Sequence, residues 1–297
     1  MTAPSLGDGT RADSPGQSAA RRTLRGGLVA GKYASLLIAS AFVLVPLIVV
    51  LVTSLKSDRE VLNSGGVLSP PRNWANGANY ATAWRTGNML NAFKNTAIIL
   101  VISVAGSVVI GAMTAFAIDR FEFRFKRVVV GAFLLASLVP GITTQVATFQ
   151  VVDRLGLYDS RLAPIALYTG TDIVSIYIFL QFIRSIPRSL DEVARLDGAS
   201  SWRIFWRIIF PLLKPAIATV VIIKGIAIYN DFYIPFLYMP DQNLGTISTS
   251  FFRWVGPYGS QWNVISAALV IIILPTLVAF LFLQRFIYNG LARGSTK

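Results

Sequence analysis

Long apolar runs separated by short polar segments fill most of the chain after residue 33. A bilayer core of ~30 Å requires about 20 apolar residues in helical conformation, so runs of that length predict membrane spans. Six runs qualify, at residues 34–55, 92–118, 128–152, 164–183, 216–237 and 263–283. The pattern therefore predicts an all-α integral membrane protein with six transmembrane helices.

The composition supports this prediction and excludes several kinds of chemistry. Of 297 residues, 54% are hydrophobic and 14% are charged, which is too apolar for an ordinary soluble domain. Histidine and cysteine are both absent, so the commonest general base, the commonest metal ligand and any disulfide are missing. We therefore predict no catalytic residue, no metal site and no cofactor bound by this chain. The net charge is +13, and the charged residues lie between apolar runs. We therefore expect contact with membrane lipid and no nucleic-acid partner.

The distribution of basic residues predicts the orientation of the six spans. One set of alternating connections, which includes both termini, carries 18 Lys and Arg residues, and the other set carries seven. Cytoplasmic loops carry an excess of such residues, so both termini are expected in the cytoplasm. The expected location is the inner membrane of a bacterial or archaeal cell.

The sequence divides into three parts. Residues 1–33 are expected to be a disordered basic cytoplasmic tail, because their first 20 residues are rich in Ser, Gly, Ala and Pro without apolar periodicity. Residues 34–290 form the transmembrane domain, and residues 291–297 form a second cytoplasmic tail. The first span is longer than a signal-peptide core and lacks a small-residue cleavage site near Ser57, so we expect an uncleaved anchor.

The cytoplasmic loop at residues 185–215 has helical signals of its own. Pro187 and Ser189 favour the start of a helix, and Gly198 can supply the left-handed residue that ends it. Ser200 or Ser201 can cap a second, amphipathic helix that runs toward Pro211. From this pattern alone, the loop is either a lever that transmits displacement of a soluble partner to two spans or an amphipathic hairpin that lies on lipid.

A family signature distinguishes between these alternatives. The loop resembles the EAA loop of ABC importer permeases, which reads Glu-Ala-Ala, three residues, Gly, nine residues and Ile-x-Leu-Pro. The residues that match this signature are Glu192, Ala194, Gly198, Ile208 and Pro211. Val193 and Phe210 replace the first Ala and the Leu, and neither replacement removes the turn or the acidic residue. The fuller family pattern is also matched by Asp197, Ala199, Leu212 and Pro215.

The resemblance implies a type I ABC importer permease fold in which residues 190–210 are the cytoplasmic coupling helix. It implies three kinds of partner: a second homologous permease subunit, an ATPase homodimer or heterodimer and an extracellular solute-binding protein. ATP and Mg would bind to the ATPase partners. The ATPase-coupling residues carried over are Glu192, Ala194, Asp197, Gly198, Ala199, Ile208 and Pro211.

The resemblance covers most of the chain and narrows the family to carbohydrate permeases. The segments that carry it are Pro70, Pro71, Asn79 and Tyr80 after the first span, residues 94–96 at the start of the second and residues 229–232 in the fifth. Residues 284–291 are similar to the end of the G-type subunit of maltose-like transporters, and the similarity stops after Leu291. The implied function is to form, with the second permease, a membrane path for a di- or oligosaccharide.

Polar residues within the spans are the candidates for this path, because ionisable groups in a bilayer are costly and often functional. The candidates are Asp172, Thr171, Tyr229, Asn230 and Asp231. Lys224 and Asp231 are two turns apart, so they can also pair with each other through a third group, or with residues of a neighbouring span. Structural and path-lining roles both remain open for Asp172 and Lys224.

An ion-coupled secondary transporter of a polar solute is the alternative function, since it also needs intramembrane charges and broken helices. It predicts an internal repeat, which this sequence lacks, and it gives no role to the EAA-like loop.

Aromatic residues of the outer loops, such as Trp74, Trp84, Trp254 and Trp262, are either interfacial anchors or contacts for a docked partner. Proline residues interrupt several spans and are either hinges or kinks fixed by packing; they are Pro46, Pro140 with Gly141, Pro235 and Pro275.

Overall fold

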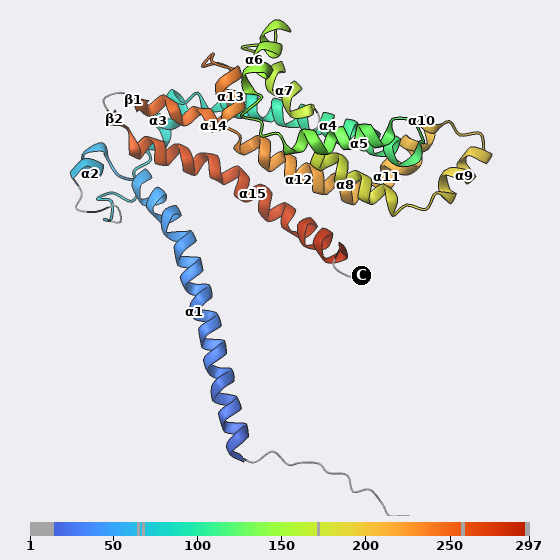
Figure 1. The fold of residues 1–297 in the computed structure, drawn as a ribbon. Coiled ribbons are helices and arrows are strands. Elements are labelled where there is room, and N and C mark those ends of the chain that lie inside the picture. Colours follow the sequence, from blue (N-terminus) through green and yellow to red (C-terminus); the bar gives the residue numbers. More distant parts are fainter. Residues whose placement is uncertain (1–14, 64–65, 67–68, 171–172, 257–258, 295–297) are drawn as a thin grey trace, which may run out of the picture.

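The computed structural model describes residues 15–63, 66, 69–170, 173–256 and 259–294 (Figure 1). Within these ranges the fold is almost entirely helical, with one two-stranded antiparallel sheet. The helices of the first half are α1 (Pro15–Ser54), α2 (Asp58–Asn63), α3 (Ala78–Thr86), α4 (Met89–Arg120), α5 (Lys126–Leu138), α6 (Gln145–Arg154), α7 (Leu162–Thr169) and α8 (Ile173–Arg184). The elements of the second half are α9 (Ser189–Leu196), α10 (Ser201–Ile204), the π-helix η1 (Phe205–Ile209), α11 (Phe210–Leu212), α12 (Lys214–Asn230), α13 (Tyr233–Tyr238), α14 (Ile247–Ser250), the 3₁₀-helix η2 (Phe251–Trp254), β1 (Val255–Gly256), β2 (Gly259–Ser260) and α15 (Trp262–Gly294).

Among the described residues, three continuous helices are long and apolar enough to cross a membrane: Val29–Ser54, Met89–Arg120 and Trp262–Phe282. Two bent pairs also qualify when each pair is taken as one span. They are Leu162–Thr169 with Ile173–Arg184, bent by 42°, and Ser201–Leu212 with Lys214–Asn230, bent by 73°. These elements correspond to five of the six predicted runs.

The remaining run, residues 128–152, is not one continuous helix. It is divided between α5 and α6, which have 13 and 10 residues, and residues 139–144 separate them. Pro140 lies in this break, and a proline has no amide hydrogen to donate to the preceding turn. Gly141 follows it and weakens helical continuation further.

Two other boundaries differ from the sequence prediction. Helix α1 begins at Pro15, inside the stretch expected to be disordered, because proline is well suited to the first helical turn and Ala, Arg and Leu follow it. The fifth predicted run ends its first helix at Asn230 and resumes as α13 at Tyr233. The intervening Asp231 accepts hydrogen bonds from the amides of Tyr233 and Ile234, at 2.7 and 3.3 Å, and so caps α13.

Helix α4 lies at the centre of the main core and packs against α7, α8 and α12. Its buried face carries small residues at helical spacing, including Ser103, Ser107, Gly111 and Ala115. By contrast, α1 leaves the other helices at a steep angle, and Figure 1 shows it diverging from α15. The side chains of residues 29–48 are exposed, so within residues 29–54 the helix α1 contributes to this chain's core near its end at Ser54.

Buried amides connect the ends of the spans on the side opposite α9. Asn79 donates to the carbonyls of Ser54 and Lys56, both at 2.8 Å, and accepts from Asn263 at 3.0 Å. Asn95 donates to the carbonyls of residues 243 and 245 and accepts from the Arg161 guanidinium at 2.8 Å. The asparagines of the family-like segments are therefore structural ties in this fold.

Candidate functional site

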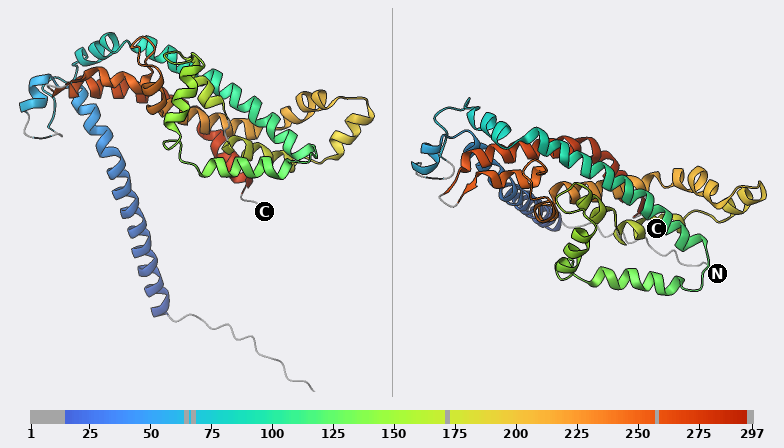
Figure 2. Two further views of the ribbon diagram at one scale, coloured as in Figure 1. Left: turned by 45° about the horizontal axis from the view of Figure 1, so that its top comes forward. Right: turned by 90° about the horizontal axis from the view of Figure 1, so that it is seen from above.

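The candidate site is the segment of residues 185–215, between α8 and α12. Figure 2 shows that α9 and α10 project beyond the end of the helical bundle in both views. The end of α4 lies beside this projection, since its last residue, Arg120, contacts Ile186 and Asp191, and the end of α8 leads directly into it. A segment in this position is accessible to a partner and remains connected to the membrane-spanning core.

Local interactions close α9 at the predicted glycine. Gly198 has φ +78°, a left-handed conformation that L side chains adopt at a cost. The amide of Ala199 donates to the carbonyl of Ala194 at 2.9 Å, and the amide of Gly198 donates to that of Arg195 at 3.0 Å. This pair of bonds is the Schellman motif, so the predicted helix end at Gly198 is confirmed.

The second half of the segment begins at a serine cap and ends in a sharp bend. The Ser200 hydroxyl accepts from the amide of Arg203 at 3.3 Å, which selects Ser200 from the two predicted caps. Pro211 cannot donate to the preceding turn, and the helix before it widens into η1, closed by the Phe210 amide on the Phe205 carbonyl. The fully buried Leu213 lies at the 73° bend that leads into α12.

The structure divides the seven predicted coupling residues into an exposed set and an inward set. Exposed residues are Glu192, Asp197, Gly198 and Pro211. Ala194 is buried, and Ala199 and Ile208 are half-buried and pack on the main core. The small size of Ala194 therefore serves packing within this chain. Gly198 instead faces open space, since a β-carbon added to it would meet no heavy atom within 4 Å.

The outward face of α9 is more apolar than a solvated helix requires. Leu190, Val193 and Leu196 are 43%, 59% and 87% exposed and lie three residues apart. Residues at this spacing line one face of a helix, and an exposed apolar face of this kind suits insertion into a groove of another protein. Sequence reasoning identified the loop but not this apolar stripe, although the spacing of the three residues was a usable signal.

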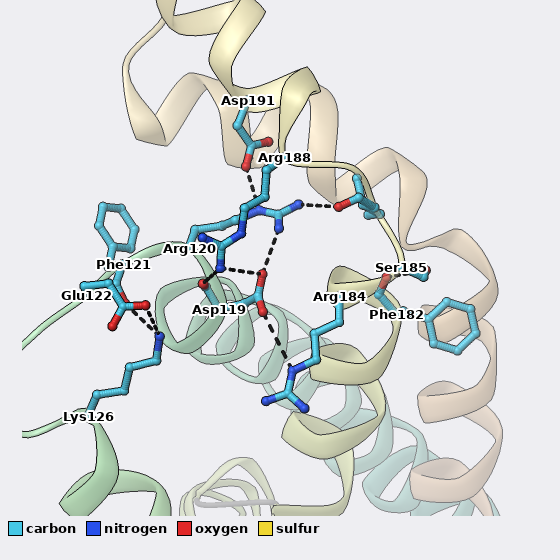
Figure 3. Close-up of polar contacts among 11 residues, drawn as sticks. Asp119, Arg120, Phe121, Glu122, Lys126, Phe182, Arg184, Ser185, Arg188 and Asp191 are labelled. Carbon is cyan, nitrogen blue, oxygen red and sulfur yellow. Dashed lines mark hydrogen bonds and ion pairs between the residues drawn. The ribbon is translucent and has the colours of Figure 1, made fainter.

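A cluster of charged residues connects α9 to the C-terminal ends of α4 and α8 (Figure 3). The Arg120 guanidinium is paired with Asp191 of α9 at 2.6 Å and with the neighbouring Asp119 at 2.7 Å. Arg184 and Arg188 approach Asp119 at 3.8 and 4.0 Å. The sequence interpretation used these arginines only to predict the orientation of the spans and did not pair them with Asp119 or Asp191, because their separation along the chain gave no sign of contact.

Two of the membrane-depth charges are linked through a tyrosine. Tyr168 donates its hydroxyl to Asp231 at 2.8 Å, and Lys224 donates to the Tyr168 carbonyl at 3.2 Å. Of the two structural alternatives that the sequence left open, the structure shows a link between Lys224 and Asp231 through a third group, Tyr168, which belongs to the neighbouring helix α7. One carboxylate oxygen of Asp231 thus accepts a hydrogen bond from Tyr168, and the other accepts from the α13 amides.

The other path candidates differ in their exposure and in their hydrogen-bond partners. Tyr229 is half-buried and donates its hydroxyl to the Ile272 carbonyl of α15 at 2.8 Å, which ties α12 to α15. Asn230 is exposed, and its amide donates to the Ile226 carbonyl of its own helix. Thr171 and Asp172 lie outside the described residues. Of the described candidates, Asn230 is the most exposed.

Comparison with known proteins places this site in a family. Residues 107–293 match the family described as the inner membrane component of binding-protein-dependent transport systems. The chain belongs to that family. The matched range includes α4 from its middle onward, the segment of residues 185–215 and nearly all of α15.

Alignments with named relatives cover most of this permease. It is 31% identical to the melibiose/raffinose/stachyose import permease protein MelC of Bacillus subtilis, over 74% of this chain and 80% of that protein. It is 30% identical to the diacetylchitobiose uptake system permease protein NgcG of Streptomyces coelicolor, over 89% and 87%. It is 28% identical to the sn-glycerol-3-phosphate transport system permease protein UgpE of Yersinia pestis, over 86% and 93%.

A solved structure has the same fold. One chain of a bacterial ABC transporter involved in the import of the acidic polysaccharide alginate superposes with a TM-score of 0.74 at 20% identity, covering 93% of this chain and 99% of that chain. Together with its relatives, this similarity makes the protein a multi-pass membrane permease with the ABC importer permease fold. Its role is that of a transport subunit and not that of an enzyme.

Proposed function

We propose that this permease and a second, homologous permease form the membrane path for a di- or oligosaccharide. An extracellular solute-binding protein delivers the sugar, and two ATPase subunits drive the cycle. Relatives named for melibiose, raffinose, stachyose and diacetylchitobiose support this class of substrate. An exposed asparagine such as Asn230 suits such a solute, because an uncharged polyhydroxylated molecule is recognised by neutral hydrogen-bonding groups.

The observation that carries the proposal is the outward face of α9. An apolar stripe on a short, capped helix, projecting from a chain of this family, fits a groove on the ATPase. Glu192, Asp197 and Gly198 lie on the exposed part of the same segment, and Ala194, Ala199, Ile208 and Pro211 fix its conformation. We assign the coupling role to this segment, with ATP and Mg held by the ATPase subunits.

The same arrangement supports an orientation with both termini in the cytoplasm. The side with the excess of Lys and Arg includes the connections at residues 120–127 and 184–214, which meet beside α9. Docking of a cytoplasmic ATPase at α9 requires the same orientation. The exposed apolar surface of α1 is available for lipid and for the second permease.

Reconstitution of the complex tests this function. The permease is purified with its co-expressed neighbours and placed in proteoliposomes, and ATP hydrolysis is measured with and without the binding protein against a panel of disaccharides and oligosaccharides. We expect hydrolysis and sugar uptake to rise together when the binding protein carries its own sugar. Uptake by the isolated chain under a proton or sodium gradient, without ATP, would refute the proposal in favour of the secondary transporter.

A further inference from the structure

We propose that Asp119 and Arg120 form a mechanical link that makes α4 move with the docking helix α9. This inference rests on the proposed coupling role of α9 and concerns how α9 itself is fastened to the span at the centre of the core. The segment is covalently joined to α8 and α12, and its η1 part packs on α4 through the rings of Phe205 and Phe116, whose centroids are 5.3 Å apart. The charged cluster adds a direct contact between α9 and the end of α4. Arg120 and Asp119 are positioning residues in this account, since they contact neither ATP nor sugar.

The three nitrogens of the Arg120 side chain contact three different groups. Nε lies 2.6 Å from a carboxylate oxygen of Asp191 of α9, an ion pair that lacks hydrogen-bond geometry, whereas one terminal nitrogen donates to Asp119 at 2.7 Å and the other donates to the Ile186 carbonyl at 3.0 Å. Ile186 lies in the connector between α8 and α9, so this one guanidinium joins α4 both to that connector and to α9. A guanidinium suits this task because its planar donors point in fixed directions, which a lysine ammonium cannot reproduce.

Asp119 completes the link from the other side. Its backbone carbonyl accepts from Arg188 at 2.9 Å, and its carboxylate lies 3.8 Å from Arg184 at the end of α8. Figure 3 shows these side chains converging on the last turn of α4. The contacts therefore connect α4 with α8, with the connector and with α9.

Burial indicates that the link is specific and not only a surface attraction. The side chains of Arg120 and Asp191 are 3% and 8% exposed, and of the eight residues of α9 only Asp191 and Ala194 are buried. A buried ion pair is no more stable than well-packed apolar residues of similar volume, so its distinctive property is a defined geometry between its partners. Among the described contacts, that geometry joins α9 to the helix at the centre of the core.

Neutralising variants test the link in the full transporter complex. Arg120→Gln removes the positive charge and leaves the buried Asp191 carboxylate without a counter-charge, which costs free energy. The double variant Arg120→Gln/Asp191→Asn removes both charges and so avoids that cost. The matched control is Glu122→Gln, which removes another 2.8 Å ion pair, to Lys126, from the same connection. In that pair Glu122 is exposed and Lys126 is half-buried, and the two residues are only four apart in the chain.

The measurements are co-purification of the ATPase, ATP hydrolysis and sugar uptake in proteoliposomes. We expect the double variant to assemble and hydrolyse ATP while the sugar transported per ATP falls by about tenfold. The Glu122→Gln complex should keep the wild-type ratio. A wild-type ratio in the assembled double variant would overturn the proposal.

A distance measurement on the intact cluster gives a second test that does not depend on the stability of these variants. The chain has no cysteine, so spin labels can be attached at Glu122→Cys, after α4, and Ser189→Cys, at the start of α9. Both positions are exposed. With trapping of nucleotide verified in the same sample, the separation of the labels should stay constant between the nucleotide-free and vanadate-trapped complexes. A change of about one helical turn, ~5.4 Å, would overturn the proposal.

The two proposals fail in different ways. If the coupling role of α9 is wrong, the wild-type complex itself shows no hydrolysis that depends on the binding protein. If only the link is wrong, the wild-type complex is active, and the double variant or the label distance gives the contrary result.

Discussion

The left-handed glycine at the end of α9 gives the sharpest test of the coupling segment. In Gly198→Ala, the alanine must keep φ +78°, which costs ~1–2 kcal/mol for a residue with a β-carbon. Lower entropy of the unfolded chain offsets ~0.4–1 kcal/mol of this cost, and no heavy atom lies close enough to add a clash. The net cost of about 1 kcal/mol corresponds to about a fivefold shift from the closed helix end toward a frayed one.

A second glycine in this chain supplies the matched control. Gly156, after α6, has φ +67°, and a β-carbon added to it would also meet no heavy atom within 4 Å, so Gly156→Ala introduces the same kind of strain far from α9. We expect Gly198→Ala to lower ATP-driven uptake about fivefold, Gly198→Asn to lower it less because asparagine tolerates this conformation, and Gly156→Ala to leave uptake near wild type. Uptake and the melting temperature in detergent are measured for all three. Equal loss of uptake in both alanine variants, or full uptake in Gly198→Ala, would refute the reasoning.

Three further predictions concern other parts of the fold. Asp231→Ala removes the cap of α13 and should lower stability by about 1 kcal/mol, seen as a lower melting temperature; an unchanged melting temperature with lost uptake would instead indicate direct contact with the solute. Gly87→Ala would bring a β-carbon within 2.6 Å of the Trp254 ring, so we expect a loss of ~1–3 kcal/mol in thermal unfolding, and wild-type stability would contradict this packing. Hydrogen bonds from Ser57 and the amide of Arg72 lower the pKa of Glu60 to about 2. Because the pKa is depressed, these contacts contribute their full stability above the unfolded value of 4.5, and this stability is lost as pH falls toward 2. The rate of proteolysis between residues 57 and 72 should therefore be constant from pH 7 to 5. A transition in that range would count against the contacts.

The sequence by itself determined the features that depend on neighbours along the chain. The apolar runs predict membrane spans because a bilayer sets their length and polarity. Gly198 and Ser200 predict the end of one helix and the start of the next because their hydrogen bonds reach only three to five residues. The same local chemistry identified Pro140 and Gly141 as an interruption of the third run, although not its full length.

Only the tertiary structure decided which distant polar groups meet. Arg120 and Asp191 belong to different helices, and their ion pair exists because α4 and the 185–215 segment pack at the same end of the molecule. Tyr168 joins Lys224 to Asp231 through one hydroxyl and one carbonyl, an arrangement that helical spacing within a single span could not specify. Trp254, one of the aromatic residues with two open interpretations, is buried and donates to Thr86 at 2.9 Å. In each case the partner is chosen by how the helices pack, because side-chain contacts between helices depend on relative positions that short-range preferences do not fix.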